Sequence, residues 1–193
     1  MISCGRDDVQ LGNWVLTKII DFKVFSGFDC ENDDLNDFIL NDAAPHKMEL
    51  LAETYAFKLK DEGGRISVPL AFVSLLNDSI KLQTNRQKRP IPNSMRTYPG
   101  LPAVKIGRLG VHADYHRGGI GTRLLNCIKV LFTTNNRTGC RFLTVDAYNE
   151  ECTLDFYGKN EFMFLYNQDA EKQTRIMYYD LKKFSTCPES TSN

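Results

Sequence analysis

A cluster of glycines lies between a stretch that is typical of a strand and a stretch that is typical of an amphipathic helix. The cluster reads Tyr115-His116-Arg117-Gly118-Gly119-Ile120-Gly121-Thr122. Glycines let a backbone approach a ligand closely, and the free N–H groups and the dipole at the start of a helix favour an anion. Phosphate binding is one interpretation. The other is a tight turn whose glycines only permit positive φ angles, and the cluster alone leaves both open.

Two common phosphate-binding loops are excluded by inspection. A nucleoside triphosphate loop requires Lys followed by Ser or Thr after its last glycine, whereas Thr122 and Arg123 follow Gly121. A dinucleotide fingerprint requires a third glycine at the position that Leu124 occupies. If the cluster binds phosphate, it therefore does so as a loop of another class.

The segments around the cluster are predicted to position it. Residues 103–111 are strand-like, and the helix is expected to begin near Gly119. Its apolar stripe consists of Ile120, Leu124, Leu125, Ile128, Leu131 and Phe132, and its outward face of Arg123, Asn126 and Lys129. Residues 142–145 form an apolar run typical of a strand that is covered on both faces. Strand, helix and strand in this order predict a parallel pair in a mixed α/β sheet.

Further elements are predicted on both sides of this unit. Strands are expected at 14–20, 54–59, 66–76, 162–166 and 174–181, with a hairpin between 54–59 and 66–76 and a short addition at 79–82. Asp33 and Asp34 supply N-cap chemistry for a helix that Pro45 is expected to break, which gives two short helices before Ala52. Another short helix is expected at 151–159.

Length and composition are those of one ordinary globular domain. The chain has 193 residues and 22.0 kDa, with 42% hydrophobic and 25% charged residues and a mean hydropathy of −0.35, which excludes a disordered, collagen-like or membrane-bundle protein. We expect a single domain over 1–184 and a frayed tail over 185–193. Because no signal-like or membrane-spanning apolar run is present, we expect a cytoplasmic protein without membrane contact.

The cysteines lie far apart and form no C-x-x-C pair, so we expect buried, reduced thiols rather than a disulfide frame or a zinc site. They are Cys4, Cys30, Cys127, Cys140, Cys152 and Cys187. No metal site is predicted.

Residues 77–102 differ in composition from the rest of the chain. They hold four of the seven prolines and one acid, Asp78, together with the cations Lys81, Arg86, Lys88, Arg89 and Arg96. The whole chain has 24 basic and 24 acidic residues and a formal charge of +0, so any basic site must be local. A solvated basic loop and a binding surface are both consistent with this segment.

Two motifs together resemble the GNAT superfamily of acetyl-CoA-dependent N-acetyltransferases. Residues 116–121 are similar to the family's pyrophosphate loop, with His116 at a position where the family usually has Gln or Arg. Residues 108–111 resemble the end of the family's fourth strand, and 154–162 resemble its later helix with a Phe-Tyr pair. The resemblance spans about 14–181. It implies the GNAT acyltransferase fold, a central twisted mixed sheet of about six or seven strands flanked by about four helices.

The resemblance also implies roles for individual residues. Acetyl-CoA, the cosubstrate, would be held by Leu109, Gly110, Val111, His116, Arg117, Gly118, Gly119, Ile120, Gly121, Thr122 and Asn149. Tyr157 would act as general acid to the CoA thiolate, since a phenol with a pKa of about 10 is protonated at neutral pH yet close enough to a thiol to share its proton. In the alternative interpretations, Tyr157 only packs its helix and Asn149 only forms a turn.

No general base is identified. Asp146, Glu150 and Glu53 are candidates, but each is equally consistent with a solvated carboxylate. His116 is disfavoured as the base, because by the same resemblance it would face pyrophosphate and lie far from the thioester.

The expected activity is direct acetyl transfer to a primary amine of unknown identity. An alternative comes from residues 28–39 and 52–55, which are similar to a GNAT branch that includes bacterial toxins of toxin-antitoxin pairs, and these acetylate aminoacyl-tRNA. In that case the basic loop over 81–96 would meet tRNA phosphates, together with Lys105, Arg108, Arg117 and Arg123.

An alternative of another class is a module that binds acetyl-CoA without turnover. The resemblance also suggests an antitoxin as a partner in the toxin case and a homodimer, as in many relatives.

Overall fold

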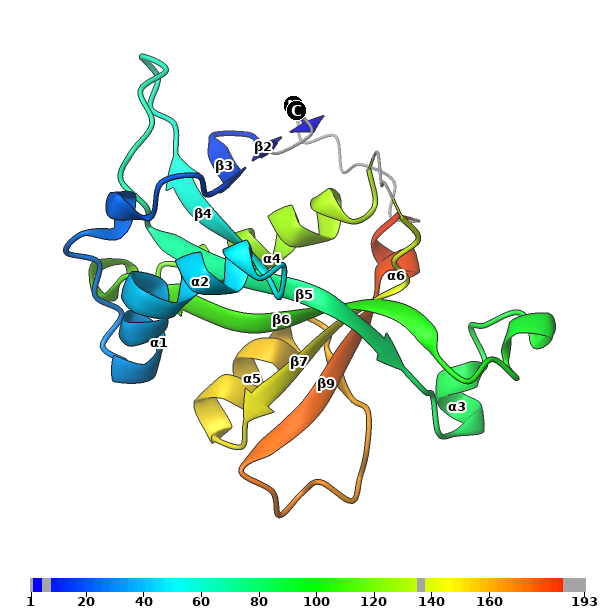
Figure 1. Cartoon of the computed structure of the whole chain (residues 1–193). Helices are drawn as coiled ribbons and strands as arrows, with labels where there is room; N and C mark the ends of the chain where they lie inside the picture. The colour runs from blue at the N-terminus through cyan, green and yellow to red at the C-terminus, as the bar shows by residue number, and fades with distance from the viewer. Residues whose placement is uncertain (1, 5–7, 135–137, 186–193) are drawn as a thin grey trace. The chain divides into compact units, whose positions relative to one another are not determined.

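The computed structural model describes residues 2–4, 8–134 and 138–185 (Figure 1). The predicted tail lies outside the described residues from 186 onward. Contacts divide the chain into two compact units: unit 1 comprises 1–76 and 106–136, and unit 2 comprises 77–105 and 137–193. Two long strands, β5 (Ala71–Ile80) and β6 (Leu101–Val111), contribute residues to both units. The expectation of a single domain over 1–184 stays a prediction.

Unit 1 is built on an antiparallel run of strands. Its order is β1 (Ile2–Cys4), β2 (Asp8–Leu11), β3 (Trp14–Lys18), β4 (Glu53–Leu59), then the first part of β5 and the last part of β6. The predicted hairpin is confirmed, with Tyr55 opposite Val73. However, β5 begins at Ala71 rather than at 66, because Pro69 has no N–H to donate to a ladder.

The segment before β4 is mostly helical, and residues 33–48 form one helical run without a break. It consists of the 3₁₀ turn η1 (Phe22–Phe25), α1 (Asp33–Asp37), the π-helical turn η2 (Phe38–Asp42) and α2 (Ala43–Met48). Pro45 does not end the helix, contrary to the prediction: the helical run continues to Met48, and the π-helical turn η2 directly before α2 replaces the regular hydrogen-bond pattern next to the proline, which has no N–H to donate. The N-cap of α1 is Asn32, whose side chain accepts from the Leu35 N–H at 3.0 Å.

The core of unit 1 is an aromatic cluster under these helices. Phe72 of β5 packs against three other rings, those of Phe25, Phe28 and Phe38, with ring centroids 5.6–6.3 Å apart. All four side chains are buried. This packing holds the helical segment on the strands that end near the glycine cluster.

Helix α4 (Ile120–Leu131) confirms the predicted amphipathic segment. The inner positions of the stripe are fully buried, and Arg123 is exposed as expected. Lys129 is a correction, because it is 4% exposed rather than outward-facing. Cys127 and Val130 beside it are buried as well, so the buried face of α4 is wider than one stripe and takes in the aliphatic stem of the lysine.

Unit 2 contains the other ends of β5 and β6, followed in the sheet by β7 (Phe142–Tyr148), β9 (Thr174–Asp180) and β8 (Met163–Phe164). Strands β7 and β9 are antiparallel, with Phe142 opposite Asp180. The helices are α3 (Asn85–Lys88), α5 (Glu151–Lys159) and α6 (Leu181–Ser185). The described residues form nine strands rather than six or seven, mainly because β1 and β2, with three and four residues, are too short for a period of two to be recognised in a sequence.

Four cysteine side chains are described, and all are free thiols. Cys30 and Cys127 are buried as predicted, and burial raises the pKa of Cys127 to about 12. Cys140 is half-buried and Cys152 is exposed, contrary to the prediction. The predictions for the side chains of Cys4 and Cys187 lie outside the described part of the chain.

Across the described ranges, no group of three or more His, Cys, Asp or Glu residues is placed to hold a metal. None of the helices in those ranges has the length and apolar character that crossing a membrane requires.

Candidate functional site

The glycine cluster in unit 1 connects the end of β6 to the start of α4 through the 3₁₀ turn η4 (Ala113–Tyr115). Gly119 is the N-cap of α4 with φ 74° and ψ 11°, and no side chain caps the helix there. Gly119 is left-handed and Ile120 is right-handed, the alternation that turns successive N–H groups toward one concavity. The N–H groups of the first turn of α4 are therefore available to an anion.

The glycines of the cluster differ in what an added Cβ would contact. Gly119 has a positive φ, and a Cβ at this position would lie 2.7 Å from Nη1 of Arg123, so the arginine side chain would have to move. A Cβ at Gly118 would lie 3.2 Å from the carbonyl oxygen of Tyr115. Arg117 also has a positive φ of 59°, which is uncommon for a residue with a side chain. The loop therefore holds two left-handed residues within three positions.

His116 fastens the loop to the strand before it. Its Nε2 lies 2.8 Å from the carbonyl oxygen of Val111, and its Nδ1 lies 3.8 Å from a carboxylate oxygen of Glu31. Because a carbonyl only accepts, Nε2 carries the proton in this hydrogen bond. His116, at the position where the resembled family usually has Gln or Arg, thus connects the end of β6 with the segment before α1.

Of the four cations outside the basic loop that are expected to meet tRNA phosphates, three have partners within their own unit. In unit 1, Arg108 lies 3.6 Å from Asp34 and its guanidinium lies over the Phe38 ring, while Arg123 donates to the carbonyl of Gly118. In unit 2, Lys105 lies 3.0 Å from Asp146. Arg117, the fourth, is exposed beside the loop and has no such partner in the described part of the chain.

At the end of β6, the groups that are expected to contact the cofactor belong to the backbone rather than to side chains. Leu109 and Val111 are half-buried, and Gly110 between them is buried. A Cβ at Gly110 would lie 2.6 Å from the Phe72 ring, so this glycine makes room for the core. The pairing of this backbone with a pantetheine arm stays a prediction, as do the cofactor contacts of the loop.

In unit 2, Tyr157 lies on α5 and is 6% exposed. Its ring packs against Phe156 and Phe162, with centroids 5.0 and 5.3 Å away. Burial raises the pKa of the Tyr157 phenol above its ordinary value, so the hydroxyl is protonated at neutral pH. This environment fits a proton donor, and it equally fits the packing role; the general-acid role stays a prediction.

Asn149 follows β7, and its side-chain amide donates both of its hydrogens to one loop. Its Nδ2 donates to the carbonyls of Ala170 at 2.8 Å and of Lys172 at 2.9 Å, and its backbone N–H donates to the carbonyl of Gln173 at 2.9 Å. These bonds are those of the turn-forming alternative. A cofactor contact would have to use the Asn149 oxygen, and it stays a prediction.

The carboxylates considered as bases have different surroundings. Asp146 is paired with Lys105 at 3.0 Å, and Glu53 is paired with Lys18 at 2.8 Å. Glu150 precedes α5 as its N-cap residue but makes no side-chain capping bond. None of these arrangements assigns a base.

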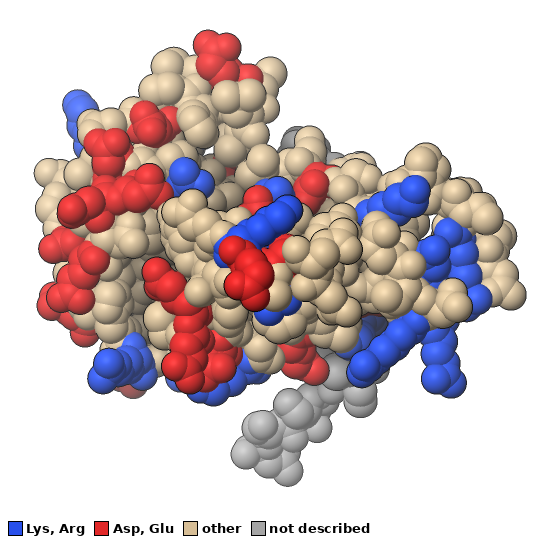
Figure 2. Space-filling view, turned by 90° about the horizontal axis from the view of Figure 1, so that it is seen from below, with Lys and Arg blue, Asp and Glu red and all other residues tan. Residues whose placement is uncertain are grey.

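The basic segment of unit 2 is more ordered than its composition suggests. Helix α3 begins with a capping box in which Thr84 and Gln87 satisfy each other's backbone N–H groups. The one acid, Asp78, is already engaged, because it accepts from the Thr144 hydroxyl at 2.6 Å and the Ser79 N–H at 2.7 Å. Figure 2 shows lysines and arginines gathered over this segment. The positive charge is therefore gathered locally, which is consistent with both a solvated basic loop and a binding surface.

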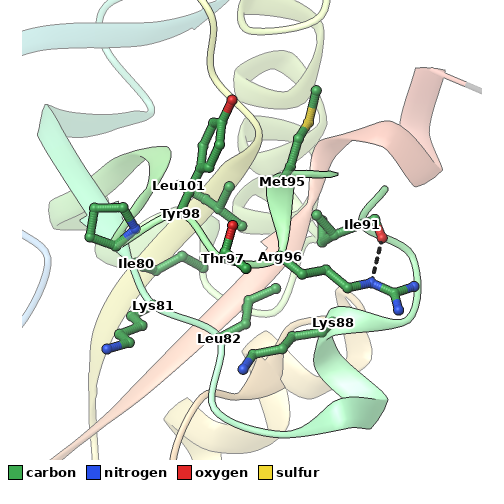
Figure 3. Close-up of a pocket in the computed structure, with 11 residues that line it drawn as sticks. Ile80, Lys81, Leu82, Lys88, Ile91, Met95, Arg96, Thr97, Tyr98 and Leu101 are labelled. Atoms are coloured by element: carbon green, nitrogen blue, oxygen red, sulfur yellow. Dashed lines mark hydrogen bonds between the residues drawn. The ribbon is translucent and has the colours of Figure 1, made fainter. Parts of the chain in front are cut away.

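A pocket of about 460 Å³ lies in this segment (Figure 3). Its apolar lining consists of Ile80, Leu82, Ile91, Met95, Tyr98, Pro99 and Leu101, and its polar lining of Lys81, Lys88, Arg96 and Thr97. Arg96 turns along the wall, where its guanidinium donates to the carbonyls of Ile91 at 2.8 Å and Arg89 at 3.1 Å. The lining of the pocket therefore combines apolar side chains with three cations.

Trp14 lies beside a residue that contacts the glycine cluster, and the sequence pattern did not single it out. Trp14 opens β3, and the guanidinium of Arg123 lies 5.1 Å from the centre of its ring. Trp14 is the one tryptophan in the sequence. No local pattern joins it to a residue more than a hundred positions away, so only the fold reveals the contact.

No protein-family model matches the sequence, and no curated protein matches it. Solved structures do match. A mutant of KacT, with a tyrosine replaced by phenylalanine, has a TM-score of 0.69 at 22% identity, covering 90% of this chain and 98% of that one. AtaT complexed with acetyl-methionyl-tRNAfMet has a TM-score of 0.66 at 18% identity, covering 89% of this chain and 97% of that one.

AtaTR bound with acetyl-CoA also matches, with a TM-score of 0.62 at 17% identity, covering 91% of this chain and 98% of that one. At these identities the likeness establishes the fold. Over 90% of its length, the chain has the mixed α/β fold of the GNAT toxins KacT and AtaT, as the resemblance in its motifs predicted.

Proposed function

We propose that this protein transfers an acetyl group from acetyl-CoA to the amino group of an aminoacyl-tRNA and acts as the toxin of a toxin-antitoxin pair. The observation that carries the proposal is the likeness to AtaT in complex with acetyl-methionyl-tRNAfMet. The motifs alone favoured an amine acceptor of unknown identity. The shared fold and the ordered basic segment favour the aminoacyl-tRNA alternative over it.

In the proposed reaction, unit 1 binds acetyl-CoA through the glycine cluster. The uncapped N–H groups at the start of α4 would accept the pyrophosphate, with Arg117 adding charge beside them. The half-buried backbone of Leu109 and Val111 would pair with the pantetheine arm. The match to AtaTR bound with acetyl-CoA supports this choice of cosubstrate.

Unit 2 would supply the proton for the leaving group. The amine nitrogen attacks the thioester carbonyl, so that a C–N bond forms and the C–S bond breaks. Tyr157 gives its proton to the departing thiolate, and the amine loses one to solvent or to a base that is not assigned. The Tyr157 phenol is in its acid form at working pH, as this role requires.

The basic segment over 81–96 would contact tRNA phosphates. The segment itself holds no acidic residue, and Lys81 and Lys88 line a pocket. Such contacts bind a polyanion without reading its sequence.

By the same likeness, the partner that restrains the protein would be an antitoxin, since a matched AtaT toxin is bound to the C-terminus of the antitoxin AtaR. A homodimer stays a prediction.

The test is transfer of label from radiolabelled acetyl-CoA into a cell extract, with the wild-type protein compared with Tyr157→Phe. We expect label that depends on Tyr157 in the aminoacyl-tRNA fraction. Label confined to proteins or small amines would contradict the proposed acceptor. No label that depends on Tyr157 in any fraction would contradict the proposed activity and favour a module that only binds acetyl-CoA.

A further inference from the structure

Arg123 makes two contacts that meet at the glycine cluster. Its Nη1 donates to the carbonyl oxygen of Gly118 at 3.2 Å. The same guanidinium lies over the Trp14 ring, 5.1 Å from the ring centre. A residue in the first turn of α4 therefore reaches back to the loop while it stacks on β3 of the sheet.

The bond to Gly118 has a consequence for the next N–H group. The peptide between Gly118 and Gly119 is trans, so the C=O and the N–H point in opposite directions. With its carbonyl held by Arg123, this peptide turns the Gly119 N–H away from Arg123. Gly119 permits the arrangement, because any Cβ there would lie 2.7 Å from Nη1 of Arg123.

The Trp14 ring is itself fixed. It stacks on the buried Phe57 ring with a centroid distance of 5.4 Å and an interplanar angle of 11°. Trp14 also pairs with Leu11 of β2 and Leu59 of β4, so it lies inside the sheet of unit 1. Arg123 is exposed, and the indole is what restricts its guanidinium to one side of the loop.

We propose that Trp14 and Arg123 form a clamp that positions the Gly118–Gly119 peptide and thereby sets the affinity of unit 1 for the pyrophosphate of acetyl-CoA. This inference rests on the proposed function, because acetyl-CoA is the ligand. Both residues are positioning residues: Arg123 acts through the Gly118 carbonyl, and Trp14 acts through Arg123.

The test measures the affinity for acetyl-CoA by calorimetry in matched variants. We expect Arg123→Gln to weaken binding about tenfold, because it removes both a charge-assisted hydrogen bond and the contact with the Trp14 ring. Arg123→Lys is expected to recover little of this, because an ammonium cannot stack flat on the indole while bonding the carbonyl. Trp14→Leu is expected to weaken binding about threefold. Melting temperatures show that each variant is folded.

The control is Arg117→Gln, which removes a cation from the same loop that has no partner in the described part of the chain. We expect a smaller loss than for Arg123→Gln. A second readout is the fluorescence of Trp14, the one tryptophan of the chain. Its emission should change on adding acetyl-CoA to the wild type and to Arg117→Gln, but not to Arg123→Gln.

Equal losses in Arg117→Gln and Arg123→Gln, with full recovery in Arg123→Lys, would overturn the clamp, because the charge alone would then account for binding. Unchanged affinity in Trp14→Leu and Arg123→Gln would overturn it as well, while leaving the proposed function intact. Failure of the wild-type protein to bind acetyl-CoA would overturn both proposals together.

Discussion

The glycine cluster of unit 1 and the basic segment of unit 2 present different chemical groups to a phosphate: backbone N–H groups in the cluster and cationic side chains in the segment. In the cluster, the backbone is fixed by His116, and the nearby Arg108 and Arg123 are committed to partners in the chain. In the basic segment, Lys81 and Lys88 line a pocket together with apolar side chains, and nearby Asp78 accepts hydrogen bonds from Thr144 and Ser79. Directed N–H groups suit one small anion, whereas mobile cations suit a polyanion of variable shape.

The difference teaches that net charge is a poor guide to phosphate binding in this chain. The formal charge is +0, yet in the proposed function one region would bind through geometry and the other through local charge. Salt should therefore separate them, because long-range attraction to many phosphates weakens steeply with ionic strength and directed hydrogen bonds to one ligand weaken less.

The largest expected effect is that of removing the Tyr157 hydroxyl, which tests whether chemistry depends on a group outside both regions. Tyr157→Phe should lower kcat by at least about a hundredfold, the range of a lost general acid. Affinity for acetyl-CoA and for tRNA should not change, because the ring still packs on Phe156 and Phe162. Steady-state kinetics and calorimetry measure the two quantities, and unchanged kcat would contradict the assigned role.

Gly119→Ala should damage the first region alone. The new methyl group would strain a residue with φ 74° and displace Arg123, so we expect the Kd for acetyl-CoA to rise by about tenfold or more. Binding of tRNA should stay the same. Gly139→Ala is the matched control, since nothing lies within 4 Å of a Cβ at that position. Equal effects of the two substitutions on acetyl-CoA affinity would show that Gly119 is not special.

The double substitution Lys81→Gln and Lys88→Gln should damage the second region alone. If each lysine meets one phosphate, the slope of log Kd against log salt for tRNA should fall by about one to two, with a loss of a few-fold in affinity. Affinity for acetyl-CoA should be unaffected. Lys159→Gln, which removes an exposed lysine of α5 paired with Asp155, is the control. An unchanged slope in the double variant would remove the basic segment from tRNA binding.

The smallest effect is spectroscopic and follows from the raised pKa of Tyr157. Unfolded tyrosine ionises near about pH 10, whereas the buried phenol keeps its proton to higher pH. The folded wild type and Tyr157→Phe should therefore give the same phenolate absorbance up to about pH 10. The free energy of unfolding of the wild type should also fall relative to the variant as the pH rises above that value. A phenolate signal from Tyr157 at lower pH would contradict its burial.

Much of the site could be predicted from local pattern. The glycine cluster and the stripe of α4 are readable because a helix repeats every 3.6 residues and glycines mark backbone freedom. Lys129 was misjudged, since a long aliphatic stem can be buried where a single stripe places it outside. Pro45 was misjudged because a π-helical turn beside it lets the helical run continue, and no local pattern in the sequence marks such a turn.

Contacts between distant residues could not be predicted. The Trp14–Arg123 contact joins two elements of unit 1 through the register of β3 against its neighbours. In unit 2, Arg141 binds both carboxylate oxygens of the buried Asp180 at 2.7 and 2.9 Å, a pair set by the register of β7 against β9. Such contacts exist only in the folded chain, and no residue spacing in the sequence predicts them.

The most direct test of the proposed function uses a purified reaction. Radiolabelled acetyl-CoA is incubated with the protein and methionyl-tRNA, or with the same tRNA uncharged, and the ester bond is then hydrolysed. The account predicts labelled N-acetylmethionine from the charged tRNA only, with none formed by Tyr157→Phe. Absence of label from charged tRNA, while the wild-type protein binds acetyl-CoA and acetylates another amine, would contradict it.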